Sequence, residues 1–411
     1  MRHILCIMCF VVLSMTAAQA QYYGSTNKKA IKAYQSGIDA MNHGDPGKAI
    51  AKYKEALKYD PDFVEMYLSI GEIYMKAKQY NEAIAAYEAF LKADKRHKEW
   101  QEGARENISL MRWRMDAVRN PVDFDPTNLG NAINSPDDEY LPALTVDGKT
   151  LIFTRRFPAN DQTVHTAPFE EDFYISSLNG GSWSKAVRMA EPVNSHDNEG
   201  AQCISQDGRI MFFTACGRRD GEGRCDLYMC TRKGNKWSKP RNLGPDVNTP
   251  AWESQPSFAI DGRTVYFASN RKGGYGGNDI WKTTFTDGRW SRPENLGPLI
   301  NTPGNEVSPF IHYNNHTLYF ASDGHIGMGG ADIFKAEMDE NGQWQKPVNL
   351  GYPINTERDE SGLIVAADGK TAYFSSEREG GYGKQDIYRF ELPQEAQTEA
   401  VAYQTGVVFN K

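Results

Sequence analysis

The stretch "SNRKGGYGGNDIW", residues 269–281, decides the fold, because its glycines could either cradle a phosphate or join two strands. A phosphate-binding loop opens a helix, whose N-terminal N–H groups hold the anion. Here the flanking segments "TVYFAS" and "DIWKTTF" are rich in β-branched and aromatic residues, which predicts a strand on each side. Related stretches recur at residues 322–334 and 376–388. The glycine loop is therefore predicted to be the turn of a repeated hairpin.

A longer unit surrounds this hairpin and repeats five times from residue 121 onward, with a spacing of 53–60 residues. Four units end in a segment such as "WSKPRNLGPDVN", whereas the fifth has no such ending. One spare ending, "FDPTNLGNAIN" at residues 124–134, precedes the first unit. A closed ring explains this arrangement, because the N-terminal segment completes the last blade. The sequence predicts a five-bladed β-propeller over residues 121–392; the alternative of six blades needs a unit that the sequence does not contain.

The region before the propeller has the periodicity of helices. "GDPGKAIAKYKEALKYDPDF" at residues 44–63 is followed, 34 residues later, by "KQYNEAIAAYEAFLKADKRH" at residues 78–97. Small residues and one tyrosine recur at this offset: Gly37 and Gly71, Ala49 and Ala83, Tyr53 and Tyr87. The pattern resembles the tetratricopeptide repeat, which implies two pairs of packed helices and a capping helix over residues 28–118.

The N-terminal residues 1–20, "MRHILCIMCFVVLSMTAAQA", combine a basic start, an apolar run and an Ala-x-Ala end. This pattern is typical of a secretory signal peptide and predicts an exported protein. No other stretch is long and apolar enough to predict a transmembrane segment. Residues 121–411 carry a net charge of −11, which argues against a nucleic acid partner.

A glutamate opens each unit of the predicted propeller, at the start of the expected innermost strand. Five such carboxylates could ring one mouth of the central channel and bind a cation or another ligand. Alternatively, each could pair with an arginine, such as Arg155, Arg271 or Arg378, and lock neighbouring blades together, although units 2 and 4 lack an arginine at the matching position. The five candidate residues are Glu139, Glu199, Glu253, Glu306 and Glu360.

Catalytic chemistry finds little support in the sequence. Five-bladed propellers also host glycosidases, which use two carboxylates on one substrate. A catalytic pair must be unique in the ring, but the obvious acids of this chain recur in every unit. The histidines are scattered, no nucleophile motif is present, and the Cys spacings of zinc sites are missing. The sequence therefore predicts no catalytic residue, no metal, no cofactor and a protein that is not an enzyme.

Four cysteines lie within 28 residues of the second unit. Cys216 and Cys225 flank the loop "GRRDGEGR" at the ends of two adjacent strands. Such positions are roughly 4.5–5.5 Å apart, within reach of a disulfide, and export favours its formation. Cys203 and Cys230 are expected on strands that are separated by a third, and so they are predicted to stay reduced.

The repeated units resemble the TolB-type, WD-repeat-like propeller blades. A tetratricopeptide front joined to such a propeller resembles outer-membrane-associated proteins of Bacteroidetes-type bacteria. In that family a carboxypeptidase-regulatory-like β-domain and an OmpA-like, peptidoglycan-binding domain follow, and some members serve type IX secretion and gliding. The last residues, "EAVAYQTGVVFNK", fit the opening strand of such a β-domain, so residues 393–411 are predicted to be a linker and its stump.

The resemblance implies a periplasmic, outer-membrane-associated scaffold with protein partners in the cell envelope, close to glycan or peptidoglycan. Without an OmpA-like part, the anchoring role of the family does not carry over to this chain. The first alternative is a module that recognises a glycan or peptide at the channel mouth. The second alternative is a glycosidase-like propeller enzyme.

Overall fold

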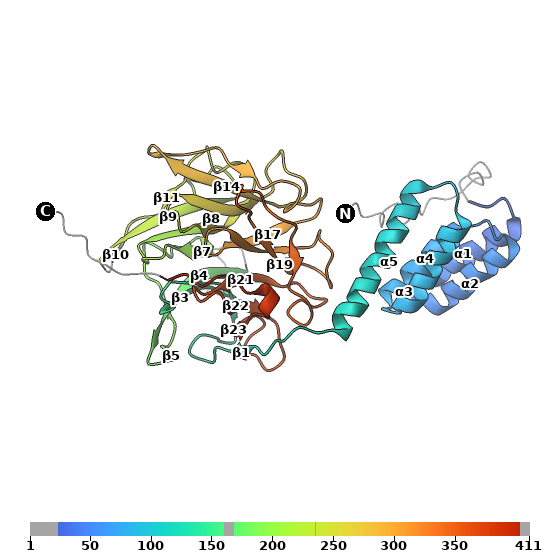
Figure 1. The fold of residues 1–411 in the computed structure, drawn as a ribbon, viewed down its shortest axis with the longest axis horizontal. Helices are drawn as coiled ribbons and strands as arrows, with labels where there is room; N and C mark the ends of the chain where they lie inside the picture. The colour runs from blue at the N-terminus through green and yellow to red at the C-terminus, as the bar shows by residue number, and fades with distance from the viewer. Residues whose placement is uncertain (1–23, 160–167, 235, 403–411) are drawn as a thin grey trace. The chain divides into compact units, whose positions relative to one another are not determined.

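The computed structural model describes residues 24–159, 168–234 and 236–402, which form a helical unit up to Asn120 and a β unit from Pro121 (Figure 1). The predicted signal peptide lies outside the described residues. The predicted fold class is confirmed: tetratricopeptide-type helices are followed by a five-bladed β-propeller.

Five helices make up the part of the first unit that the structure describes. They are α1 (Lys28–Asn42), α2 (Pro46–Tyr59), α3 (Glu65–Lys76), α4 (Tyr80–Ala93) and α5 (Lys98–Arg119). The first two begin at residues whose side chains cap the helix, because Asn27 accepts N–H bonds from Lys29 and Ala30, and Asp45 accepts one from Lys48. Neighbouring helices pack through a buried core of alanine, tyrosine and phenylalanine side chains.

Two glycines allow the paired helices to approach closely. A Cβ atom on Gly37 would lie 2.3 Å from the ring of Tyr53, and one on Gly71 would lie 3.0 Å from the ring of Tyr87. Both tyrosine rings therefore occupy space that any other residue on the facing helix would need. This is the packing that the 34-residue pattern predicted.

Five antiparallel blades make up the second unit, and the first strands of successive blades contact one another around the ring. Blade 1 contains β2 (Asp138–Leu144), β3 (Thr150–Pro158), β4 (Phe169–Asn179), β5 (Ser182–Trp183) and β6 (Val187–Arg188). Blade 2 contains β7 (Asn198–Ile204), β8 (Ile210–Cys216), β9 (Cys225–Lys233), β10 (Lys236–Trp237) and β11 (Arg241–Asn242). Blade 3 contains β12 (Glu253–Phe258), β13 (Thr264–Ser269), β14 (Asp279–Thr286), β15 (Arg289–Trp290) and β16 (Glu294–Asn295).

The last two blades have four strands each. Blade 4 contains β17 (Glu306–Ile311), β18 (Thr317–Ser322), β19 (Asp332–Glu337) and β20 (Val348–Asn349). Blade 5 contains β21 (Ser361–Val365), β22 (Thr371–Ser376), β23 (Asp386–Glu391) and the N-terminal strand β1 (Thr127–Asn128).

The ring closes in blade 5, where β1 pairs with β23 (Figure 1). The side chain of Asn134 fastens this junction: its Oδ1 accepts the N–H of Ile387 at 2.8 Å, and its Nδ2 donates to the Ile387 carbonyl at 3.0 Å. Asn128 donates to the carboxylate of Asp386 at 2.7 Å. The spare N-terminal ending thus completes the fifth blade, as the count of repeated segments predicted.

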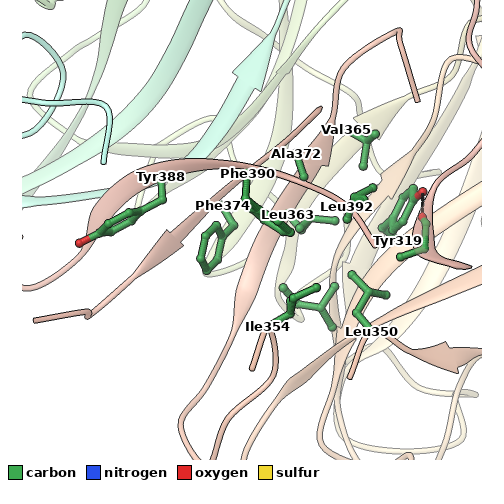
Figure 2. Close-up of a cluster of buried hydrophobic side chains, with 12 residues drawn as sticks. Tyr319, Leu350, Ile354, Leu363, Val365, Ala372, Phe374, Tyr388, Phe390 and Leu392 are labelled. Carbon is green, nitrogen blue, oxygen red and sulfur yellow. Dashed lines mark hydrogen bonds between the residues drawn. The ribbon is translucent and has the colours of Figure 1, made fainter. Parts of the chain in front are cut away.

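The segment after β23, which the sequence predicts to be a linker, packs on the propeller over residues 393–401. The hydroxyl of Tyr319 donates to the carbonyl of Ala396 at 2.7 Å, beside a buried cluster that includes Leu392 (Figure 2). The N–H groups of Thr398 and Val401 donate to carbonyls of the β21–β22 turn region. Residues 403–411, which were expected to open a further domain, lie outside the described residues.

Candidate functional site

A glutamate lies within one residue of the start of each inner strand and holds the loop in front of it. In blade 3, Glu253 accepts the N–H of Thr249 at 2.8 Å, the Thr249 hydroxyl at 2.7 Å and the Ser269 hydroxyl at 2.9 Å. The same pair of bonds, from the N–H and the hydroxyl of a residue four positions earlier, recurs in every blade. The donors in the other blades are Ser135, Ser195, Thr302 and Thr356.

Arginines give three of these carboxylates a charged partner. The distances from guanidinium nitrogen to carboxylate oxygen are 2.6 Å for Arg155 and Glu139, 3.2 Å for Arg218 and Glu199, and 3.1 Å for Arg271 and Glu253. Two of these arginines also donate to carbonyls of the preceding connection, as Arg271 does to Val247 at 2.6 Å. The pairing hypothesis therefore describes the geometry of blades 1 to 3.

The sequence did not reveal which residues take the place of the arginine in blades 2 and 4. In blade 2, Gly217 stands where Arg271 stands in blade 3, and the next residue, Arg218, reaches the glutamate instead. In blade 4, His325 takes the equivalent place. Its Nε2 lies 2.8 Å from the carbonyl of Ile300, and its ring packs against aromatic side chains as the arginines do. These equivalent residues could not be recognised in the sequence, because Arg218 lies one position further along its blade and because His325 is not an arginine.

The five glutamates do not form the exposed ring at a channel mouth that the sequence suggested. Four of them have no exposed surface and Glu360 has 3 %. Burial raises the pKa of Glu139, Glu199 and Glu360 to about 7, against the opposing effect of their hydrogen bonds. Enclosed and bonded in this way, the carboxylates fasten connections between blades, and a ligand could reach them only if those loops moved.

The residues that face the ring axis lie two positions after the glutamate on each inner strand. A register shift interrupts the pairing of every inner strand at this point, and the bulged residue has a left-handed backbone. The φ angles lie between 49° and 69°, a region that residues other than glycine rarely adopt. The five residues are Leu141, Ala201, Gln255, Ser308 and Gly362.

These residues border a cavity on the ring axis, the axial cavity, with a volume of about 60 Å³. It is partly open to solvent, and the described residues that line it include no Asp, Glu, Lys, Arg or His. Tyr313 closes part of it, because its buried hydroxyl crosses from blade 4 to the carbonyl of Leu144 in blade 1 at 2.8 Å. Sequence reasoning missed this site, since only Gly362 among the five bulged residues signals a left-handed backbone.

The cysteines have the pairing that the strand assignment predicted. Cys216 and Cys225 form a disulfide across the ends of β8 and β9, while Cys203 and Cys230 are free. Cys203 borders the axial cavity, and Cys230 belongs to a buried core cluster. Burial raises the pKa of both thiols to about 12, so neither is a thiolate at neutral pH.

The repeated aspartates cap the glycine loops. Asp279 accepts the N–H groups of Tyr275 and Gly276 at 2.6 and 3.0 Å, and the side chain of Asn295 at 2.6 Å. The loop glycines thus bring N–H groups to a carboxylate of their own blade, which fits the predicted hairpin turn. Within the described residues, no group of three or more His, Cys, Asp or Glu side chains could hold a metal ion. The helices of the same residues include none long and apolar enough to cross a membrane.

Comparison with known proteins supports the two halves of the fold separately. A tetratricopeptide repeat family model matches residues 34–97, in the helical unit. No curated protein matches the sequence.

Solved structures resemble the propeller. A family 117 glycoside hydrolase of the marine bacterium Zobellia galactanivorans is 11 % identical, with a TM-score of 0.45 over 69 % of this chain and 96 % of its own. An α-L-arabinofuranosidase from Lactobacillus brevis is 13 % identical, with a TM-score of 0.42 over 68 % of this chain and 100 % of its own. The arabinanase of Bacillus subtilis is 11 % identical, with a TM-score of 0.41 over 64 % of this chain and 97 % of its own.

These structures correct the prediction that the chain is not an enzyme. Glycoside hydrolases are among the structures similar to this propeller, and the prediction is therefore not kept. At identities of 10–13 % the similarity shows the fold alone, and no activity or substrate passes to this chain with it.

Proposed function

We propose that the chain is a protein-interaction scaffold whose tetratricopeptide helices bind a protein partner. The observation that carries this proposal is the tetratricopeptide repeat match over residues 34–97, together with the stacked helix pairs that those residues form. Repeats of this kind build extended surfaces from successive helices, and such surfaces serve protein recognition.

Half-buried tyrosines of the helical unit are suitable contact residues for such a partner. Tyr67, Tyr74 and Tyr80 pack their rings partly against the helical core and keep part of their surface exposed. The ammonium group of Lys54 lies 5.8 Å from the ring centre of Tyr74. Amphipathic aromatic side chains that are already held by packing contribute strongly to protein interfaces, because little side-chain entropy is lost on binding.

The compartment we propose is the bacterial cell envelope, as part of an outer-membrane-associated assembly. The signal-peptide pattern of residues 1–20 supports export, and a disulfide such as Cys216–Cys225 is stable in an oxidising compartment. The resemblance of the domain order to outer-membrane-associated proteins of Bacteroidetes-type bacteria favours an assembly of the type IX secretion kind.

Site-specific photocrosslinking in intact cells tests the proposal. A photoreactive phenylalanine analogue replaces Tyr67 or Tyr74 in the helical unit, and Phe285, on the outer hairpin of blade 3, serves as the matched control position. We expect the helical positions to crosslink to one discrete envelope protein and the control position not to do so. Crosslinks that are equally weak and diffuse at all three positions would argue against a partner on the helices.

A further inference from the structure

The axial cavity is lined mainly by apolar side chains. Its walls come from the inner strands of all five blades and include Leu141, Phe258, Phe310, Ile311 and Leu363. Because none of its lining residues is charged, an ionic group inside it would lose its hydration without gaining a partner. The uncharged walls therefore favour a bound group that carries no charge.

Polar side chains of the lining include Gln255, Ser257, Ser308 and Tyr313. The hydroxyls of Ser257 and Tyr313 have partners within the chain, and that of Ser308 does not. The residue is only 6 % exposed, and its Oγ has no hydrogen-bond partner among the described residues. Its own N–H donates to Oε1 of Gln255 at 2.8 Å, so the backbone is satisfied while the hydroxyl is not. A buried polar atom without a partner is costly and uncommon in folded proteins, which points to a bonding group supplied from outside the chain.

The size of the cavity limits what can enter. An apolar cavity of about 150 Å³ holds a benzene ring, so about 60 Å³ accommodates only two or three non-hydrogen atoms. A free molecule of that size binds no more tightly than about millimolar, even with the best efficiency known for tiny ligands. Useful affinity requires that these atoms belong to a larger partner.

We propose that the axial cavity receives a short hydroxyl-bearing side chain, threonine or serine, from a protein partner. The hydroxyl bonds to Ser308 Oγ, and the methyl group of a threonine contacts the walls at Leu141 and Ile311. This inference rests on the proposed function, since it supplies a second contact point for a protein partner, and it assigns that contact to the propeller.

Methyl NMR with ethanol, which has three non-hydrogen atoms, as the probe tests the cavity without any partner. We expect the alcohol to shift the methyl signals of Leu141, Ile311 and Leu363, and to leave those of Ile70, in the core of the helical unit, unchanged. Ser308→Ala should weaken the binding of the alcohol about fivefold, in line with the loss of one hydrogen bond. Ser322→Ala, which removes another buried hydroxyl of blade 4, is the matched control and should leave it unchanged. No shift, or shifts spread over the surface, would show that the cavity holds water alone and would overturn the inference.

Selection from a random peptide library displayed on phage then tests the nature of the partner group. The full chain should enrich peptides with threonine or serine at one fixed position, and Cys203→Leu, which fills the cavity, should remove that preference. If peptides bind without this preference, or bind equally to Cys203→Leu, the proposed function stands and the axial assignment is wrong. If ethanol binds and no peptide is captured, the occupant is not a protein side chain and the inference is again overturned.

Discussion

The two units of the chain bury their cores in different ways. The helices pack with neighbours in sequence, as when Tyr53 of α2 fills the space beside Gly37 of α1. The propeller instead depends on a contact between its two ends, because β1 pairs with β23 across more than 250 residues. A local change should therefore stay local in the helices, whereas a change at the junction of the ring should be felt around the propeller.

The pH dependence of the propeller should give the largest effect. Burial raises the pKa of Glu139, Glu199 and Glu360 to about 7, above the unfolded value of 4.5. Stability from these groups is therefore fully present below pH 4.5 and lost as pH rises through 7, on the order of 3 kcal/mol per carboxyl. Denaturant unfolding measured between pH 4.5 and 8 checks this loss.

Two substitutions separate this effect from the rest of the chain. Glu360→Gln should reduce the loss of unfolding free energy between pH 4.5 and 8 by the contribution of one carboxyl group. In the helices, the pKa of Asp94 shifts in the opposite direction. Burial raises this pKa, but hydrogen bonds from Gln101 and His97 outweigh burial and lower it to about 2. Stability from Asp94 is therefore present above about pH 4 and lost as pH falls through 2, so Asp94→Asn should lower helix stability at neutral pH and lose this effect near pH 2. Propeller stability that increases from pH 4.5 to 7 would contradict the buried-carboxyl account.

Opening the ring junction should cost about 2–4 kcal/mol. Asn134→Ala removes two bonds to Ile387 and one to Asn128, and leaves the buried backbone groups of Ile387 without these partners. Asn301→Ala is the matched control, because it removes the same set of bonds within the continuous chain. We expect similar losses of unfolding free energy, but faster protease cleavage near β1 only in Asn134→Ala. Equal protease resistance in the two variants would show that Asn134 is not needed to hold β1 against β23.

Breaking the disulfide of blade 2 should cost about 2–3 kcal/mol, the entropy of closing so short a loop. The double substitution Cys216→Ser and Cys225→Ser lowers the unfolding midpoint of the propeller, as measured by denaturant titration. Cys203→Ser and Cys230→Ser together are the matched control, in which reducing agent should still lower the midpoint. An unchanged midpoint in the first variant would indicate that the loop is held by its other contacts, such as the bond from Gly217 to Arg224.

The smallest changes in stability should come from the helices, where two Gly→Ala substitutions, each adding one methyl group, can be compared. Gly37→Ala places a Cβ in the space of the Tyr53 ring and should cost about 1–2 kcal/mol, although alanine favours the helix. Gly47→Ala in α2 has its nearest neighbour at 3.8 Å and should stabilise the helix by up to about 1 kcal/mol. Thermal unfolding followed by circular dichroism distinguishes them, and the same sign for both would refute the packing argument.

The features that the sequence predicted are those repeated by residue type. The turns, the glycine loops and the spare ending at residues 124–134 gave the number of blades and the closure of the ring. The strand assignment in blade 2 also placed Cys216 opposite Cys225. These predictions succeeded because each depends on a local turn or on the two-residue period of a strand.

The environment of the repeated side chains could not be predicted in the same way. The position of a glutamate at the start of a strand does not say which way its carboxylate turns, and the bond to a serine or threonine four residues earlier turns it inward. The left-handed residues Leu141, Ala201, Gln255 and Ser308 carry no signal in their type, because the bulge follows from the pairing of neighbouring strands. The axial cavity depends on all five bulges and could only be seen in the folded ring.

Hydrogen–deuterium exchange of the native protein tests most directly the claim that the propeller is held as one closed ring. The amides of β1 and β23 at the junction are compared with those of β13 and β14 in blade 3, which lie in the continuous chain. If the junction is as firm as the rest of the ring, both sets exchange equally slowly and only by cooperative opening. Exchange of β1 and β23 that is much faster than that of β13 and β14 would show that the ring opens at its ends, and would contradict the account.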